Sequence, residues 1–415
     1  MSIPLLYIDP GTGSALFSIF IGLAATLYFF SRTLFIKLKI SLSGGKAVKS
    51  ASLAHPFVVY NEGKQYWSVF KPVLEEFESR GTEILYLTSA DDDPVFDHSW
   101  RYVKAEFIGE GNRAFARLNM LQAGICLMTT PGLDVFQLKR SKMTTHYSHI
   151  LHAPTDATMY RLFGIDYFDS ILLTGDYQAA DIKILERQRN LPEKKLVTVG
   201  CTYLDVYAEK IKHLPPEKNH PFTVLVSPSW GASSLLVRYG KKLLDPLTNT
   251  GWRIIVRPHP QSKKSEPEIL SGLYSCYGDK LIWDYENENI YSLAKADIMI
   301  SDFSGIVFDY TFLFGKPVIY INHGMDIRPY DAADLGENAA DNLWQFKTLR
   351  EIGIELTEDQ FDHIGEIISH ASGSKILETA GDNARKTAWQ FPGEGGKRIA
   401  DFMIETVNSE GADLL

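Results

Sequence analysis

Cysteine is scarce in this 415-residue sequence, which contains three: Cys126, Cys201 and Cys276. They lie far apart and form no CxxC or Cys/His spacing, so neither a disulfide framework nor a zinc site is indicated, and a reducing compartment fits best. Positive charge is also in deficit. The formal net charge of -9 argues against a protein dedicated to binding nucleic acid.

Apolar residues, in contrast, are abundant. Hydrophobic residues make up 45% of the sequence and aromatic residues 12%, which excludes a disordered protein. A chain of 415 residues is long enough for two domains of ordinary size, each with its own core.

One long stretch without charge, residues 13–30, predicts a membrane helix. With its neighbours it reaches roughly 20 residues, which is the length needed to cross a bilayer core. It lacks the positive n-region and the small-residue cleavage site of a signal peptide. The basic residues that follow it are Arg32, Lys37, Lys39, Lys46 and Lys49, which are also suited to anionic headgroups. The positive-inside rule therefore predicts a single-pass protein of the cell inner (cytoplasmic) membrane, with its large C-terminal part in the cytoplasm.

From about residue 54 the pattern alternates between strand and helix, which predicts βαβ units on parallel sheets. The predicted strands are 56–60, 82–88, 102–108, 125–129, 144–151, 170–174 and 196–199, and the helices between them are 65–79, 113–122 and 177–189. Lys212–Pro221 is rich in Pro, Lys and Asn and is typical of an interdomain linker. A second alternating series follows. We therefore expect an anchor with a basic juxtamembrane segment at 1–50, Rossmann-like domains at 51–214 and 215–385, and a C-terminal helix at 386–415 that packs back on them.

Two clusters contain residue types that can bind a metal ion. Asp91–Asp93 are followed directly by Pro94, which is typical of a solvated turn, so we assign no metal to them. His146, His149 and His152 fall on a predicted strand, where His149 faces away from the other two. His152 lies where this strand ends and would present an imidazole, suited to proton transfer, to a cleft. The alternative is a histidine that bonds to a loop carbonyl.

The second half contains two turns rich in hydroxyl groups, each before a helix. Ser301, Asp302, Ser304 and Gly305 lie between a strand at 297–300 and the next helix. Ser229, Trp230 and Gly231 precede a predicted helix at 235–247. Backbone N–H groups at the positive end of a helix dipole bind anions, and phosphate above all. In the alternative reading these residues only cap their helices.

The short motif Arg257-Pro258-His259-Pro260 follows the predicted strand 253–256. Its two prolines fix the backbone around His259. A rigidly held imidazole beside the guanidinium of Arg257 is poorly suited to packing in a core. The same pair is well suited to binding a pyrophosphate.

Together these motifs resemble the CDP-glycerol glycerophosphotransferase family, the teichoic-acid-type polymerases and primases. The matching features are the His loop at His152, the segment VLVSPSWG, the RPHP motif and above all ADIMISDFSGIVFDYTFLFGKP. Members of the family usually carry His-Gly in the first motif and Arg after the Trp of the second. This sequence has His152-Ala153 and Trp230-Gly231 instead.

The resemblance implies an α/β, GT-B-like fold in which two doubly wound Rossmann-type domains face a cleft, here preceded by one transmembrane helix. The N-terminal domain would take the acceptor and the C-terminal domain the nucleotide donor. It also implies an enzyme that moves a polyol phosphate, glycerol phosphate or similar, from a CDP-activated donor to a hydroxyl of a lipid-linked or glycan acceptor, in cell-envelope or capsule polymer synthesis. No cofactor is firmly implied, and whether a divalent metal assists is left open.

In this reading each candidate residue has a role. His152 is the general base, and His259 with Arg257 binds or protonates the phosphate beside the breaking bond. Asp309 either forms a hydrogen bond with the donor or faces solvent. The other residues would hold the donor: Ser229, Trp230, Gly231, Ser301, Asp302, Ser304 and Gly305.

Two alternatives use the same features. The first is a GT-B glycosyltransferase or a nucleotide-sugar epimerase that acts on a UDP- or CMP-sugar. The second is an inactive, membrane-tethered scaffold of an envelope-assembly complex. Retention of His152, Arg257, His259, Asp302 and Ser304 together argues against the scaffold.

Overall fold

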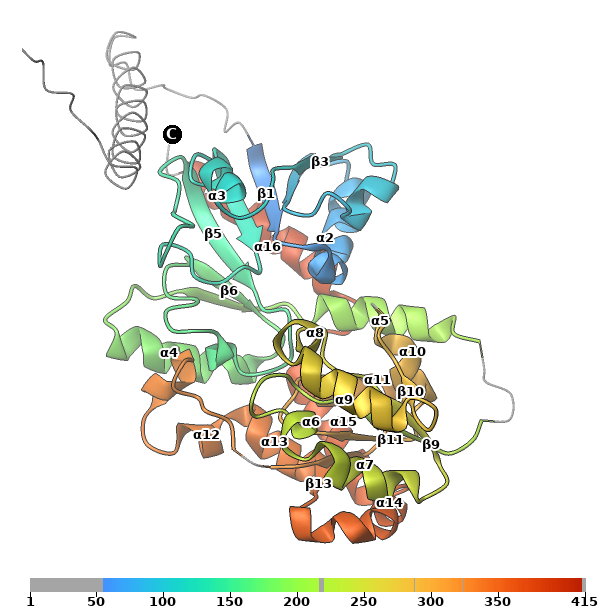
Figure 1. Cartoon of the computed structure of the whole chain (residues 1–415). Helices are drawn as coiled ribbons and strands as arrows, with labels where there is room; N and C mark the ends of the chain where they lie inside the picture. Colours follow the sequence, from blue (N-terminus) through green and yellow to red (C-terminus); the bar gives the residue numbers. More distant parts are fainter. Residues whose placement is uncertain (1–54, 216–219, 287, 323, 413–415) are drawn as a thin grey trace, which may run out of the picture. The chain divides into compact units, whose positions relative to one another are not determined.

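The computed structural model describes residues 55–215, 220–286, 288–322 and 324–412 (Figure 1). The membrane helix predicted at residues 13–30, and the basic residues after it, lie outside these ranges. Within the described ranges, no helix combines the length and the apolar character needed to span a bilayer.

The first sheet has seven strands in the order β3-β2-β1-β4-β5-β6-β7, and all neighbours run parallel. The strands are β1 (His55–Asn61), β2 (Ile84–Thr88), β3 (Val103–Phe107), β4 (Ala123–Met128), β5 (Thr144–Ile150), β6 (Ser170–Leu173) and β7 (Lys195–Thr198). Central strands such as β4 are buried along their whole length, because helices cover both faces of a parallel sheet.

The helices of this first half are α2 (Trp67–Ser79), α3 (Asn112–Leu118), α4 (Ala179–Gln188) and α5 (Thr202–Lys212). Short 3₁₀ turns also occur, at η1 (Lys64–Tyr66), η2 (Pro94–Asp97), η3 (Ala157–Met159) and η4 (Asp176–Gln178). The predicted alternation of strand and helix is therefore present, but α5 was not predicted.

The second sheet has six parallel strands in the order β10-β9-β8-β11-β12-β13. They are β8 (Thr223–Val226), β9 (Arg253–Val256), β10 (Ile282–Trp283), β11 (Ile298–Ser301), β12 (Val318–Tyr320) and β13 (Gly353–Glu355). The strand order reverses between β8 and β11, as it does between β1 and β4 in the first sheet. Open α/β sheets bind ligands beyond the carboxyl ends of the strands at such reversals.

The helices around the second sheet are α6 (Leu235–Arg238), α7 (Gly240–Thr248), α8 (Ser262–Ser265), α9 (Pro267–Tyr277), α10 (Ile290–Lys295), α11 (Ile306–Phe314), α12 (Ala339–Asn342), α13 (Trp344–Ile352), α14 (Ile364–Ala371) and α15 (Lys375–Ala388), with 3₁₀ turns η5 (Asp331–Leu335) and η6 (Glu358–His363). The single helix predicted at 235–247 is two helices, because the chain breaks at Tyr239 and Gly240 has a positive φ of 28°.

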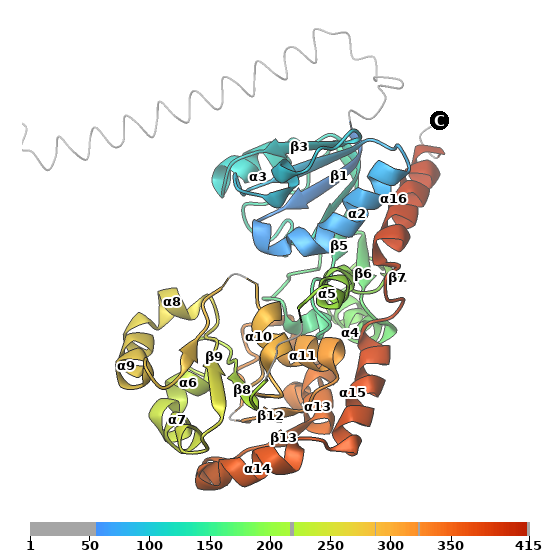
Figure 2. The same ribbon diagram turned by 90° about the vertical axis from the view of Figure 1, so that its right-hand side faces the viewer.

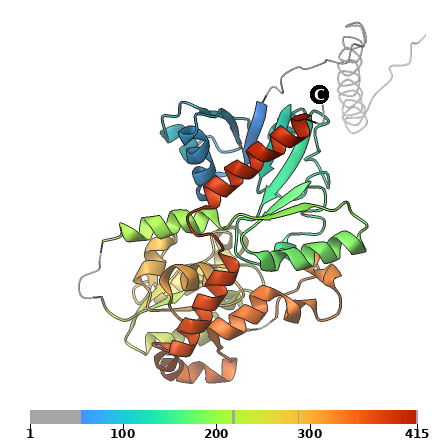
Figure 3. The same cartoon turned by 180° about the vertical axis from the view of Figure 1, so that it is seen from behind.

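The last helix, α16 (Gly395–Ala412), returns to the first half of the chain. Figure 2 shows α14, α15 and α16 following one another along one side, and Figure 3 shows α16 lying across the first sheet. Ile399, Phe402 and Met403 of α16 are buried in the same core as Phe70 of α2 and Val59 of β1.

Two buried carboxylates tie the second half to the loop after β5. Asp156 accepts hydrogen bonds from the N–H groups of Trp344 (2.9 Å) and Gln345 (2.7 Å) at the start of α13. Asp331 accepts from the N–H of Phe163 (2.6 Å) and pairs with Arg189 (2.8 Å). These contacts fix the loop that leads away from His152.

Candidate functional site

A cavity of about 400 Å³ opens where strands of both sheets end. Its walls come from the turn after β1, the end of β5, α5, and the turns after β8, β9 and β11. Six predicted site residues line it together: His152, Arg257, His259, Ser304, Gly305 and Asp309. The sequence motifs that are far apart in the chain thus meet in one place.

His152 is held through one ring nitrogen. Its Nδ1 lies 2.8 Å from the hydroxyl oxygen of Thr129 and 3.1 Å from that of Tyr160. The rings of Tyr66 and Tyr160 pack against the imidazole. Burial lowers the pKa of His152 to about 4, so the ring is neutral at pH 7.

His259 is held differently. Its Nδ1 accepts a hydrogen bond from the N–H of Gln261 at 3.1 Å, so the proton of the neutral ring resides on Nε2. Burial lowers the pKa of this imidazole as well. A neutral His259 is therefore a hydrogen-bond donor through Nε2.

Arg257 is buried and tied to its own half of the chain. Its guanidinium donates to the carboxylate of Asp284 (2.6 Å) and to the backbone oxygen of Glu286 (2.7 Å). These bonds fix the position of the guanidinium, and Arg257 is also one of the residues that line the cavity.

The start of α11 faces the same cavity with Ser304, Gly305 and Ile306. The first N–H groups of a helix have no acceptor within the helix, and the helix dipole makes this end positive. The predicted turn between strand and helix is present here. The N-cap is Gly305, so no side chain caps this helix.

Asp302 lies beneath this turn and is fully buried. Its Oδ1 accepts from the N–H groups of Ser229 (2.9 Å) and Ser304 (3.2 Å). Its Oδ2 accepts from the hydroxyl of Ser229 (2.9 Å) and the N–H of Leu235 (3.0 Å). The carboxylate therefore joins the turn after β11 to the turn after β8.

The other predicted binding residues stand behind the cavity wall or beside it. Ser229 is buried against Asp302, and Ser301 is buried and donates its hydroxyl to the backbone oxygen of Ser227 at 2.5 Å. Gly231 adopts a φ of +85°, which favours glycine, and its N–H donates to Glu266 at 3.1 Å. Trp230 is 46% exposed, and its ring lies 6.2 Å from that of His259.

Tyrosines of α5 were not predicted to be at the site, yet Tyr203 and Tyr207 both line the cavity. The hydroxyl of Tyr203 donates to the carboxyl group of Asp309. Burial raises the pKa of Asp309 to about 7, so an appreciable fraction is protonated at neutral pH. The spacing of four residues between two tyrosines was the available signal, because it places them on one helical face.

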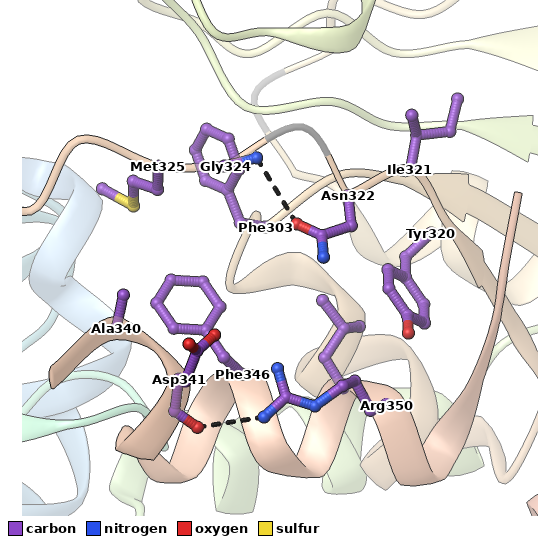
Figure 4. A pocket seen from close by; sticks show the side chains of 11 residues that line it. Phe303, Tyr320, Ile321, Asn322, Gly324, Met325, Ala340, Asp341, Phe346 and Arg350 are labelled. Atoms are coloured by element: carbon purple, nitrogen blue, oxygen red, sulfur yellow. Dashed lines mark hydrogen bonds between the residues drawn. The ribbon is translucent and has the colours of Figure 1, made fainter. Parts of the chain in front are cut away.

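A second, smaller cavity of about 120 Å³ lies on the other side of Phe303. Figure 4 shows the rings of Phe303 and Phe346 at this cavity, with Arg350 donating to the backbone oxygen of Asp341 (3.0 Å). It shares no lining residue with the larger cavity. Phe303 lines the smaller cavity and the next residue, Ser304, lines the larger one. The turn after β11 therefore lies between the two cavities.

The side chains considered as metal ligands make contacts with other residues of the protein. Asp93 is buried and accepts from Asn61 (2.9 Å) and Thr88 (2.7 Å), whereas Asp92 pairs with Lys64 at the surface. His149 is buried between Tyr160 and Phe168. In the ranges that the structure describes, no group of three or more His, Cys, Asp or Glu side chains is placed to hold a metal ion.

Residues 178–336 match the family model described as CDP-Glycerol:Poly(glycerophosphate) glycerophosphotransferase. No curated protein sequence matches the chain. Among solved structures, that of the wall teichoic acid polymerase TagF aligns with a TM-score of 0.55 and 15% identity, covering 92% of this chain and 98% of that one.

Two epimerases are also similar. The UDP-GlcNAc 2-epimerase of Methanocaldococcus jannaschii, in complex with UDP-GlcNAc and UDP, has a TM-score of 0.54 and 13% identity, covering 84% of this chain and 99% of its own. A putative UDP-N-acetylglucosamine 2-epimerase of Listeria monocytogenes has a TM-score of 0.56 and 11% identity, covering 86% and 97%. Likenesses at such low identity show the fold, and they confirm the predicted α/β, GT-B-like architecture with parallel sheets.

Proposed function

We propose that this chain, a CDP-glycerol glycerophosphotransferase-like enzyme, transfers a polyol phosphate from a CDP-activated donor to a hydroxyl group of an envelope or capsule acceptor. The observation that carries the proposal is the meeting of two imidazoles, His152 and His259, with the amino end of α11 at one cavity. A base, a phosphate ligand and a positive helix end are what a phosphoryl transfer from a nucleotide requires.

The donor diphosphate binds at the start of α11, where Gly305 and its neighbours offer backbone N–H groups. His259 donates its Nε2 proton to a phosphate oxygen beside the bond that breaks, and Arg257 adds positive charge. Asp309 bonds to a hydroxyl of the donor. The buried contacts of Asp302, Ser301 and Ser229 support a structural role for these residues instead of donor binding. They hold the turns after β8 and β11 in place.

His152 is the general base. In this proposal the proton of the neutral ring is on Nδ1, which lies 2.8 Å from the Thr129 hydroxyl oxygen. Nε2 then keeps its lone pair for the acceptor. The acceptor oxygen attacks the β-phosphorus, its proton passes to Nε2, and the bond from the β-phosphorus to the bridging oxygen breaks. The products are a phosphodiester and CMP.

In this proposal each segment of the chain has its own role. Residues 51–214 carry the acceptor and the base, residues 215–385 hold the donor, and residues 386–415 brace the first part. Residues 13–30 anchor the enzyme in the cytoplasmic membrane beside a lipid-linked or glycan acceptor. Protease treatment of intact cells tests the topology, because we expect the large C-terminal part to be protected from outside.

The reaction itself is tested by its nucleotide product. With CDP-glycerol or CDP-ribitol and a hydroxyl acceptor, we expect CMP and a new phosphodiester signal in the ³¹P spectrum. Release of a nucleoside diphosphate with a glycosidic bond, or epimerisation of a UDP-sugar, would contradict the proposal. Absence of any nucleotide binding in calorimetry would favour the inactive scaffold.

A further inference from the structure

Three exposed apolar side chains gather at the amino edge of the first sheet. Met120 is 52% exposed, Phe136 78% and Met143 45%. Contacts between their segments hold them together. The side-chain amide of Gln122 donates to the sulfur of Met143 (3.1 Å), and Asn119, beside Met120, bonds to the backbone oxygen of Gln137 (3.1 Å). With the exposed Lys139 and Lys142 they form what we call the amino-edge patch.

The amino-edge patch is basic as well as apolar. Its two lysine side chains are exposed, and the carboxylates near them are used by other groups. Asp134 accepts from the N–H of Arg140 (3.0 Å), and Asp169 pairs with the guanidinium of Arg140 (2.8 Å). The ammonium group of Lys139 donates to the backbone oxygen of Asp134 (2.9 Å). Apolar side chains beside exposed lysines are the composition that binds the boundary of an anionic bilayer.

The position of the amino-edge patch points to the same partner. His55 of β1 pairs with Ala123 of β4, and Ala123 pairs with Thr144 of β5. His55, the first residue that the structure describes, thus lies at the same end of the first sheet as Met143, with β4 between their two strands. The sequence before His55 carries the uncharged stretch 13–30 and the basic residues after it.

We propose that the amino-edge patch lies on the anionic phospholipid surface in which residues 13–30 are anchored. This contact goes beyond the proposed function, because it gives the folded part its own membrane-binding surface and fixes its orientation. Strands of seven residues, such as β1, rise about 3.3 Å per residue, so the cavity at their carboxyl ends lies roughly 20 Å from the headgroups. A lipid-linked acceptor must bridge that distance.

A fluorescent probe at one position tests this contact in the full chain. Cys276 is the exposed cysteine, whereas Cys126 and Cys201 are buried, so Cys276→Ser gives a background with no accessible thiol among the described residues. A thiol-reactive fluorophore is attached to Phe136→Cys, and to Ile376→Cys as the matched control. Ile376 is 81% exposed and lies on α15, away from the amino-edge patch.

Vesicles of phosphatidylcholine, with or without phosphatidylglycerol, carry a quencher attached to their acyl chains. We expect severalfold stronger quenching at position 136 than at position 376, and only in the vesicles that contain phosphatidylglycerol. The double variant Lys139→Glu/Lys142→Glu should lose this excess quenching. The variant Lys241→Glu/Lys386→Glu, with the same change in net charge at exposed positions, should keep it.

Two results would overturn the inference. One is the absence of excess quenching at position 136 over position 376, whether the chain binds the vesicles or stays free. The other is a change at position 136 that depends on protein concentration without vesicles, which would assign the amino-edge patch to a second copy of the chain. Both results leave CMP release from CDP-glycerol untouched, so they are distinct from a failure of the proposed function.

Discussion

The buried carboxylate of Asp302 offers the sharpest test of how the site is built. Asp302→Asn keeps the shape of the side chain and removes its charge. One oxygen remains to accept from the N–H groups of Ser229 and Ser304. The new amide group faces the Ser229 hydroxyl, which can rotate to accept, and the N–H of Leu235, which cannot.

The magnitude follows from these bonds. A hydrogen bond to a charged group contributes about 1.5–3 kcal/mol and a neutral one about 1, so the two remaining bonds lose roughly 1 kcal/mol each. An unpaired buried N–H at Leu235 adds about 1–3 kcal/mol. We therefore expect Asp302→Asn to lower the free energy of unfolding by about 3–5 kcal/mol, and to weaken CDP binding because the two turns separate.

Urea unfolding followed by tryptophan fluorescence measures the first effect, and calorimetry with CDP measures the second. Ser229→Ala removes only the hydroxyl contact and should cost about 1 kcal/mol. Asp341→Asn, an exposed position, is the control and should change stability by less than 0.5 kcal/mol. If Asp302→Asn abolished CDP binding while stability stayed at the wild-type value, the carboxylate would be a ligand of the donor, and our reasoning on its supporting role would be refuted.

Four further predictions concern the cavity. His152→Ala should reduce transfer by 10²–10⁴-fold with CDP affinity unchanged, as single-turnover kinetics and calorimetry will show. Thr129→Val should reduce transfer by about tenfold and shift the acidic limb of its pH profile, because Nδ1 loses one partner. Burial lowers the pKa of His152 to about 4 and that of His149 to about 3, from the ordinary histidine pKa of 6.5. The unfolded chain therefore binds more protons between these limits, and urea titrations should show stability falling as pH drops below about 6.5. Arg257→Gln leaves Asp284 buried without its cation, so unfolding should become easier by about 3 kcal/mol, whereas a change below 0.5 kcal/mol would mean that the pair contributes nothing.

The sequence predicted the sheet framework well, because local composition determines it. The strand ending at Ile300 and the strand 253–256 are short, apolar and flanked by turn residues, and they appear as β11 and β9. His152, His259 and Ser304 each follow such a strand, and carboxyl ends of parallel strands meet at one edge. Their convergence on one cavity could thus be foreseen.

Contacts between distant segments could not be foreseen. Asp302 reads as an N-cap or a phosphate ligand in the sequence, and only the fold brings Ser229, 73 residues away, onto its carboxylate. The helix α5 was missed because it directly precedes the linker-like Lys212–Pro221, and with it Tyr203 at the cavity. The roles of Asp302 and Tyr203 depend on burial and on contacts with distant segments, which the local sequence pattern does not show.

A crystal structure with bound CDP measures the central claim most directly, which is that the amino end of α11 holds the donor diphosphate. We predict phosphate oxygens 2.7–3.1 Å from the backbone N–H groups that begin at Gly305, with the Nε2 atom of His259 donating to the same group. Phosphates bound in the smaller cavity behind Phe303, or anywhere away from the start of α11, would contradict it.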